Sequence, residues 1–153
     1  MIPDMKTLLV SIDFSPISQK VVDKAGELAA GLDAKIILFN VMEPVAAYVP
    51  VGAAMDVITA PIPLEPPDME AVKARLEELS APLRAAGVPV ETLAVTGLPA
   101  DEILTAAEES GAGMIVLGSH GHGAVYQLFA GSIVTAVLHK ARVPVTVIPV
   151  HAS

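Results

Sequence analysis

The chain has 153 residues, of which 53% are hydrophobic and 17% charged, which suits one folded domain with a sizeable core and excludes a disordered chain. Seventeen acidic residues against nine basic ones give a net charge of −8, so we expect no binding to nucleic acid or to an anionic membrane. The absence of cysteine excludes disulfides and zinc–thiolate sites and favours a cytoplasmic protein.

Five apolar segments alternate with four helical patterns along the chain. The predicted strands are Lys6–Asp13, Ala34–Met42, Val88–Val95, Gly113–Gly118 and Val143–Val150. The predicted helices begin at Ser15–Pro16 with serine as the cap, at Asp68, at Pro99 and at Gly131–Ser132. This alternation predicts an α/β fold, a single doubly wound domain over residues 1–153 with a five-stranded parallel sheet and helices on both faces.

The segment from Glu43 to Pro67 interrupts this alternation. It contains six of the thirteen prolines, so we expect irregular structure and no membrane-spanning helix. It leaves the carboxyl end of the second predicted strand, the edge where doubly wound sheets bind ligands. The segment is therefore either a lid or interface, or an insertion without a specific role.

A glycine pattern follows the fourth predicted strand, with the spacing Gly118-x2-Gly121-x9-Gly131-Ser132. Glycines after a strand allow positive φ and let a ligand approach the backbone. Ser132 starts a helix, where the first amides are unpaired and the helix dipole is positive. The pattern predicts an anion cradle in an otherwise acidic protein.

This glycine pattern resembles the nucleotide-binding motif of universal stress proteins, in the UspA-like, ATP-binding subclass. The first strand ending VSID, the following FSPIS and the closing ARVPVTVIP are similar to the family's first and last strands. The resemblance covers essentially the whole chain. It implies an adenine nucleotide alpha hydrolase-like fold with strand order 3-2-1-4-5, in which the winding reverses between the first and fourth strands.

The resemblance also implies roles for individual residues. Asp13 would contact the nucleoside end and Val41 would meet the adenine through its backbone, while Ser11 stands where the family often has proline. The residues that would line the ribose and phosphates are Leu117, Gly118, His120 and Gly121. Those that would clamp the phosphates are Gly131, Ser132, Ile133 and Val134. The plain alternative for Asp13 is a strand-end acid that accepts hydrogen bonds from nearby backbone amides.

The implied ligand is ATP, AMP or ADP, with Mg²⁺ or Mn²⁺ arriving with the phosphates. His120 and His122 lack a clear third protein ligand, so no dedicated metal site is expected. We expect a nucleotide-dependent regulatory or stress-response protein without catalytic residues, and a homodimer formed through the edge strand Val143–Val150. The alternatives are a slow ATP hydrolase or autophosphorylating phosphotransferase, with Asp13 or His120 in acid–base chemistry, and a structural dimer whose loop is empty.

Overall fold

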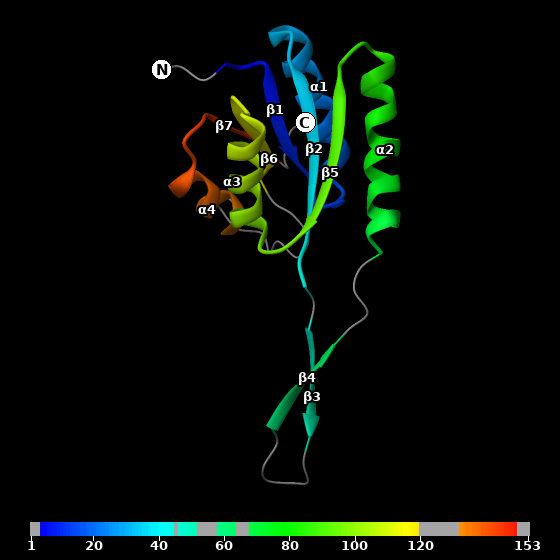
Figure 1. Ribbon diagram of the computed structural model, residues 1–153, viewed down its shortest axis with the longest axis vertical. Coiled ribbons are helices and arrows are strands. Elements are labelled where there is room, and N and C mark those ends of the chain that lie inside the picture. Colours follow the sequence, from blue (N-terminus) through cyan, green and yellow to red (C-terminus); the bar gives the residue numbers. More distant parts are fainter. Residues whose placement is uncertain (1–3, 45, 52–57, 64–67, 120–131, 150–153) are drawn as a thin grey trace.

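The computed structural model describes residues 4–44, 46–51, 58–63, 68–119 and 132–149. A parallel sheet with the strand order β5-β2-β1-β6-β7 runs through the centre of the molecule (Figure 1). Its strands are β1 (Thr7–Ser11), β2 (Lys35–Met42), β5 (Val90–Thr96), β6 (Met114–Gly118) and β7 (Val145–Ile148). Counted among these five strands, the order is 3-2-1-4-5, which confirms the doubly wound α/β prediction.

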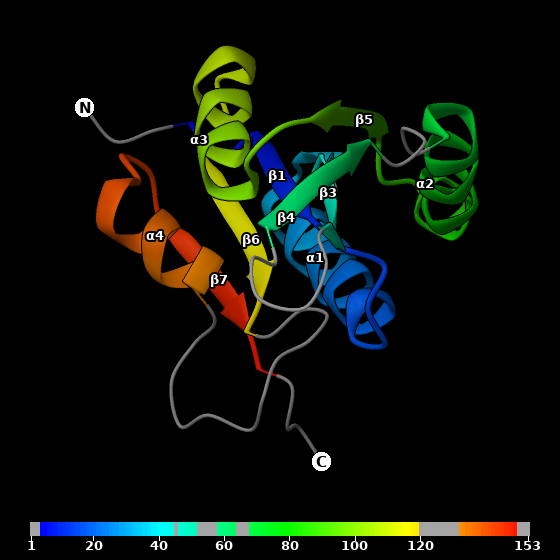
Figure 2. The same ribbon diagram turned by 90° about the horizontal axis from the view of Figure 1, so that it is seen from below.

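Helices cover both faces of this sheet (Figures 1 and 2). They are α1 (Ser18–Leu32), α2 (Met69–Ala85), α3 (Pro99–Ser110) and α4 (Ser132–Lys140). Side chains alternate along β1, so Leu8 and Val10 join the core under α1 and α2 while Leu9 joins the core under α3 and α4. The two cores are therefore separated by the sheet.

Two of the predicted helix starts are confirmed and one is wrong. Asp68 caps α2, since its Oδ1 accepts from the backbone N–H groups of Glu70 and Ala71 at 3.0 and 3.2 Å, and Pro99 is the first residue of α3. Ser15 is not the cap of α1, which begins three residues later, after Ile17. A turn precedes this helix, in which the Ser18 N–H donates to the Ser15 carbonyl oxygen at 3.0 Å. Ser15 itself is buried.

Two parts of the proline-rich segment form regular structure, contrary to the prediction for them. Residues 46–51 form β3 (Ala46–Val51) and residues 58–63 form β4 (Ile58–Pro63), which pair as an antiparallel hairpin. The ladder tolerates proline because Pro50, Pro61 and Pro63 all fall in the same alternate set of cross-strand pairs. Residues of such a set direct their N–H groups away from the partner strand, so proline removes no bond of the hairpin.

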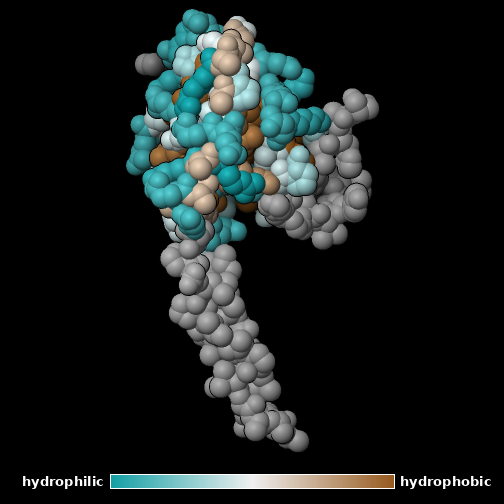
Figure 3. All heavy atoms as spheres, turned by 90° about the vertical axis from the view of Figure 1, so that its right-hand side faces the viewer, coloured by the Kyte–Doolittle hydropathy of each residue, from teal (hydrophilic) through white to brown (hydrophobic). Residues whose placement is uncertain are grey.

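The surface on the α2 side is mainly hydrophilic (Figure 3). Within the residues that the structure describes, no helix is long and apolar enough to cross a membrane.

The strands are shorter than predicted at the ends that matter for a site. β1 stops at Ser11, two residues before Asp13, and β7 covers only the centre of the predicted Val143–Val150 strand.

Candidate functional site at the switch between strands β1 and β6

The winding of the sheet reverses between β1 and β6, and the two signatures found in the sequence meet there. The ladder pairs Val10 with Val116, so Asp13 and Ser119 each lie three residues beyond the same cross-strand pair. Both segments therefore leave the sheet at the same carboxyl edge. In doubly wound folds, this reversal point is where ligands bind.

The turn after β1 is organised by the carboxylate of Asp13. Its Oδ1 accepts from the backbone N–H of Ser15 at 2.9 Å and from the Ser18 hydroxyl at 3.5 Å, while the residue itself remains exposed. Phe14 follows with a φ of 59°, an unusual conformation for a bulky residue. The Arg75 guanidinium of α2 lies 4.0 Å from the centre of the Phe14 ring. Asp13 thus has the structural role given as its plain alternative, and it still faces solvent at the switch point.

Asn40 is a member of the site that the sequence analysis missed. It is 4% exposed in the middle of β2, and its Nδ2 donates to the carbonyl oxygen of Ile12 at 2.8 Å. This bond ties the segment leading into Asp13 to the neighbouring strand. The available signal was an amide side chain inside an otherwise apolar strand, which must find a partner when buried.

Gly118 corrects part of the glycine interpretation. It is the last residue of β6 and, among the described glycines, positive φ is confined to Gly87 and Gly111. A Cβ at Gly118 would lie 2.7 Å from Cδ1 of Ile17, so this glycine lets the start of α1 pack against the end of β6. Its conformation needs no left-handed backbone because it is still within the strand ladder.

Backbone groups near Gly118 are only partly available to a ligand. Leu117 is 3% exposed, so it can meet a ligand through main-chain atoms alone. The Ser119 N–H already donates to the carbonyl oxygen of Ile148 at 2.8 Å. The Ser119 N–H is therefore not available to a phosphate.

The other predicted residues divide into three groups. Ser11 ends β1 opposite Phe39, and Val41 lies half-buried on β2. At the start of α4, Ser132 and Ile133 are exposed, whereas Val134 is buried with the α3 and α4 core. The predicted site residues that lie outside the described part of the chain are His120, Gly121 and Gly131. Among the described residues, no group of three or more histidine, aspartate or glutamate side chains is placed to hold a metal ion.

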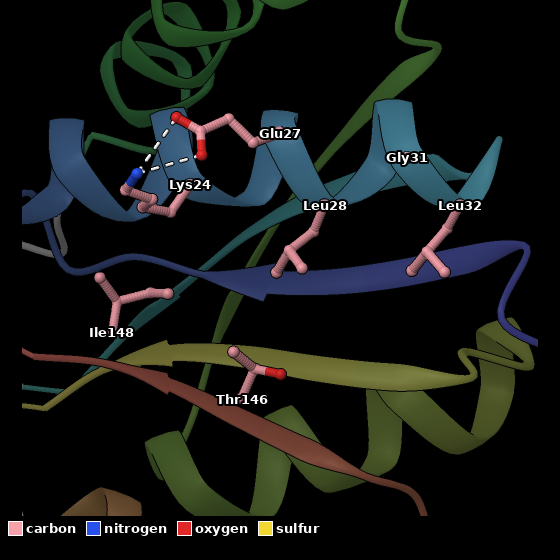
Figure 4. A pocket seen from close by; sticks show the side chains of 7 residues that line it. All are labelled: Lys24, Glu27, Leu28, Gly31, Leu32, Thr146 and Ile148. Carbon is pink, nitrogen blue, oxygen red and sulfur yellow. Dashed lines mark hydrogen bonds and ion pairs between the residues drawn. The ribbon is translucent and has the colours of Figure 1, made fainter.

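A separate groove of about 470 Å³ lies between α1 and β7 (Figure 4). Leu28 and Leu32 of α1 form one side, and Thr146 and Ile148 of β7 form the other. The Lys24–Glu27 ion pair lies on α1 at this groove, with a distance of 3.0 Å. The groove follows the edge of the sheet and does not coincide with the β1–β6 switch point.

The chain belongs to the universal stress protein family, whose family model matches residues 5–149. Universal stress protein A homolog 2 of Coxiella burnetii is 32% identical over 149 residues, covering 97% of each chain. This relationship confirms the family to which the glycine and strand patterns pointed.

Solved structures confirm the fold. A universal stress protein in complex with cAMP has a TM-score of 0.69 at 24% identity and covers 95% of this chain and 98% of its own. The universal stress protein of Archaeoglobus fulgidus in complex with dAMP has a TM-score of 0.64 at 23% identity and covers 97% of this chain and 99% of its own.

Proposed function

We propose that this chain binds an adenine nucleotide at the β1–β6 switch point and acts as a nucleotide-dependent regulatory or stress-response protein. The observation that carries the proposal is the meeting of the Asp13 turn and the Gly118 end of β6 at one carboxyl edge. Family membership and the two related proteins solved with cAMP and dAMP support this choice of ligand.

The proposal divides the site into a nucleoside half and a phosphate half. Asp13, held by the Ser15 amide, and the backbone of Val41 would take the nucleoside, with Ser11 beside them. Asn40 would position this half through its bond to Ile12. The phosphates of ATP, ADP or AMP would lie toward His120, Gly121 and Gly131 and the first residues of α4, with Mg²⁺ or Mn²⁺ bound to the phosphates.

The start of α4 suits the phosphate half for a general physical reason. α4 lies between two parallel strands, so it runs back from the carboxyl edge and its first turn lies at that edge. Ser132 is exposed there, and unpaired amides with a positive helix dipole attract anions. A chain with a net charge of −8 offers no long-range attraction to phosphate, so these local groups must supply it.

The first experiment is mass spectrometry of any ligand released when freshly purified protein is denatured. Recovery of an adenine nucleotide is the expected result.

The second experiment is calorimetric titration with ATP and with AMP, using Gly131→Val to place a branched side chain among the phosphates. We expect this variant to lose most of the affinity while its circular dichroism spectrum is unchanged.

Gly31→Val is the matched control for that titration. Gly31 lies on α1, and a Cβ there would have no neighbour within 4 Å, so the same substitution should leave affinity unchanged. Equal affinity of Gly131→Val and wild type would place the nucleotide elsewhere. ATP turnover with Mg²⁺ well above background, lost in His120→Ala, would favour the hydrolase or phosphotransferase alternative over a regulatory protein.

Among the described residues, no strand pairs with the outer side of β7, and this edge is the second part of the proposal, as the contact of a homodimer. The carbonyl oxygens of Pro144 and Ile148 accept from the N–H groups of Ile115 in β6 and of Ser119 just after it. The intervening Val145 and Val147 therefore direct their backbone groups outward. Antiparallel pairing of two such edges would satisfy these groups. The groove between α1 and β7 lies beside this edge, and its lining would become less exposed in the dimer.

A further inference from the structure

The hairpin formed by β3 and β4 stands away from the five-stranded sheet (Figure 1). A two-stranded hairpin is at best marginally stable in water, and three or more strands are needed for independent stability. We propose that the outer edge of β3 pairs with β3 of a second copy of this chain, in an antiparallel register centred on Ala47.

The register of the hairpin decides which backbone groups face outward. One set of pairs is Ala46 with Pro63, Tyr48 with Pro61, and Pro50 with Thr59. Each of these pairs contains a proline, so they cannot be the hydrogen-bonded pairs, which exchange both N–H groups. The bonds therefore belong to the alternate pairs, and the first set directs its backbone groups away from the hairpin.

The two outer edges consequently differ in what they can bind. On β4, Pro61 and Pro63 remove two of the three outward donors and leave only Thr59. On β3, the N–H groups of Ala46 and Tyr48 both remain. Proline blocks the edge of β4 to another strand but leaves the centre of the β3 edge open.

The open stretch of β3 is symmetric about its centre. Proline stands three residues on either side of Ala47, and the sequence from Pro44 to Pro50 reads PVAAYVP. In an antiparallel pair centred on Ala47, Ala46 lies opposite Tyr48 of the second copy and makes a complete hydrogen-bonded pair, and the reverse pair is identical. Pro50, the next outward-facing residue of β3, has no N–H to donate, so the ladder between the two copies ends before it.

The charge distribution is compatible with a second copy as the partner. Two chains that each carry a net charge of −8 repel one another, and an uncharged contact surface adds least to that repulsion. No residue of β3 or β4 is charged. Because β3 is both uncharged and self-complementary, the two copies would form a four-stranded ribbon in the order β4-β3-β3-β4.

Single cysteines test this register directly, because the chain has no cysteine of its own. In the proposed pairing, Ala47 faces Ala47 of the second copy across a pair without hydrogen bonds, at a Cα separation of about 4.5 Å. This distance suits a disulfide. We expect Ala47→Cys to form a covalent dimer under mild oxidation at low micromolar concentration.

Ala60→Cys is the matched control, since it makes the same change on β4. Three strand spacings of about 4.8 Å alone would separate the two copies of this residue by at least roughly 14 Å, too far for a disulfide. Equal cross-linking of the two variants would indicate random collision and overturn the proposal. Failure of Ala47→Cys to cross-link would overturn it as well.

A second pair of variants tests the outward donors in the Ala47→Cys background. Ala46→Pro removes one outward donor per copy from β3, and Thr59→Pro removes the equivalent donor from β4. We expect cross-linking to fall at least tenfold with Ala46→Pro and to be unchanged with Thr59→Pro. The opposite order, or no difference, would overturn the proposal. Neither substitution touches the β1–β6 switch point or β7, so failure here would leave the nucleotide and β7 proposals intact.

Discussion

The two edge strands of the sheet, β5 and β7, differ in the side chains that a neighbouring helix places against them. At the β5 edge, the Arg84 guanidinium of α2 donates to the outward carbonyl of Val90 at 3.1 and 2.8 Å. Glu77, also on α2, pairs with Arg84 and accepts from the Thr92 hydroxyl at 2.7 Å. At the β7 edge, Lys20 of α1 donates to the carbonyl oxygen of Pro149 just beyond the strand at 2.8 Å, and an apolar groove separates the strand itself from α1.

Among the described residues, the sheet is therefore partly closed at β5 and left open along β7. Arg84 of α2 binds the Val90 carbonyl, a backbone group that another strand would otherwise use. The β7 edge keeps its outward groups at Val145 and Val147. We infer that self-association, if it uses the sheet, uses β7 and not β5.

The largest difference in stability should come from truncating one leucine to alanine at each edge of the sheet. Leu76 of α2 is fully buried on the β5 side, so Leu76→Ala should reduce the free energy of unfolding by about 2–5 kcal/mol. Leu32 of α1 is 36% exposed at the groove, so Leu32→Ala should cost about 0.5 kcal/mol or less. Urea denaturation measures both. Equal losses would mean that the two sides are packed alike.

The second effect concerns assembly. Val147→Pro removes an outward N–H from β7, and we expect the mass in solution, measured by light scattering, to fall by half. Ala94→Pro is the control, because it removes an outward N–H from β5, where no pairing is expected. A mass that does not change with Val147→Pro would contradict the proposed β7 contact, and thermal melts would verify that both variants are folded.

The smallest effect is a pH dependence at the β5 edge. Hydrogen bonds from Arg84 and then Thr92 hold the pKa of the Glu77 carboxyl below its usual value of 4.5. Because the folded pKa is lowered, the stabilisation is complete above pH 4.5 and is lost as the pH falls through the folded pKa. Glu77→Gln should therefore lower the Tm slightly at pH 7, and this difference should shrink below pH 4.5. A constant difference across this range would exclude the ionised carboxylate as its source.

Most of the fold could be predicted because its signals are local. Buried parallel strands are continuous apolar runs, and caps such as Asp68 have a recognisable residue type. The start of α1 was predicted wrongly because Asp13 and Ser15 form a turn that a Ser–Pro pair does not reveal. The hairpin was missed because the number of prolines was considered and their spacing was not. Pro50, Pro61 and Pro63 all fall in one alternate set of cross-strand pairs, where a strand tolerates proline.

The candidate site could be predicted only in part, because several of its determinants are tertiary. Asp13 and Gly118 carry recognisable patterns, and the ladder brings their segments to the same edge. By contrast, position 118 requires glycine because the side chain of Ile17 packs where a Cβ would lie. Ile17 is 101 positions earlier in the chain. The contact of Arg75 with Phe14 likewise depends on where α2 lies against the turn.

The central position of β1 has a consequence for synthesis on the ribosome. β1 pairs with β2 soon after both emerge, but its other neighbour is β6, and Val10 must wait for Val116. Until then, the Leu8–Leu9–Val10 stretch has a bare, apolar edge in a nascent chain that already holds β2 and β5. Such long-range parallel pairing is slow and prone to aggregation. The nascent chain should therefore depend on chaperones most strongly before residue 116 has emerged.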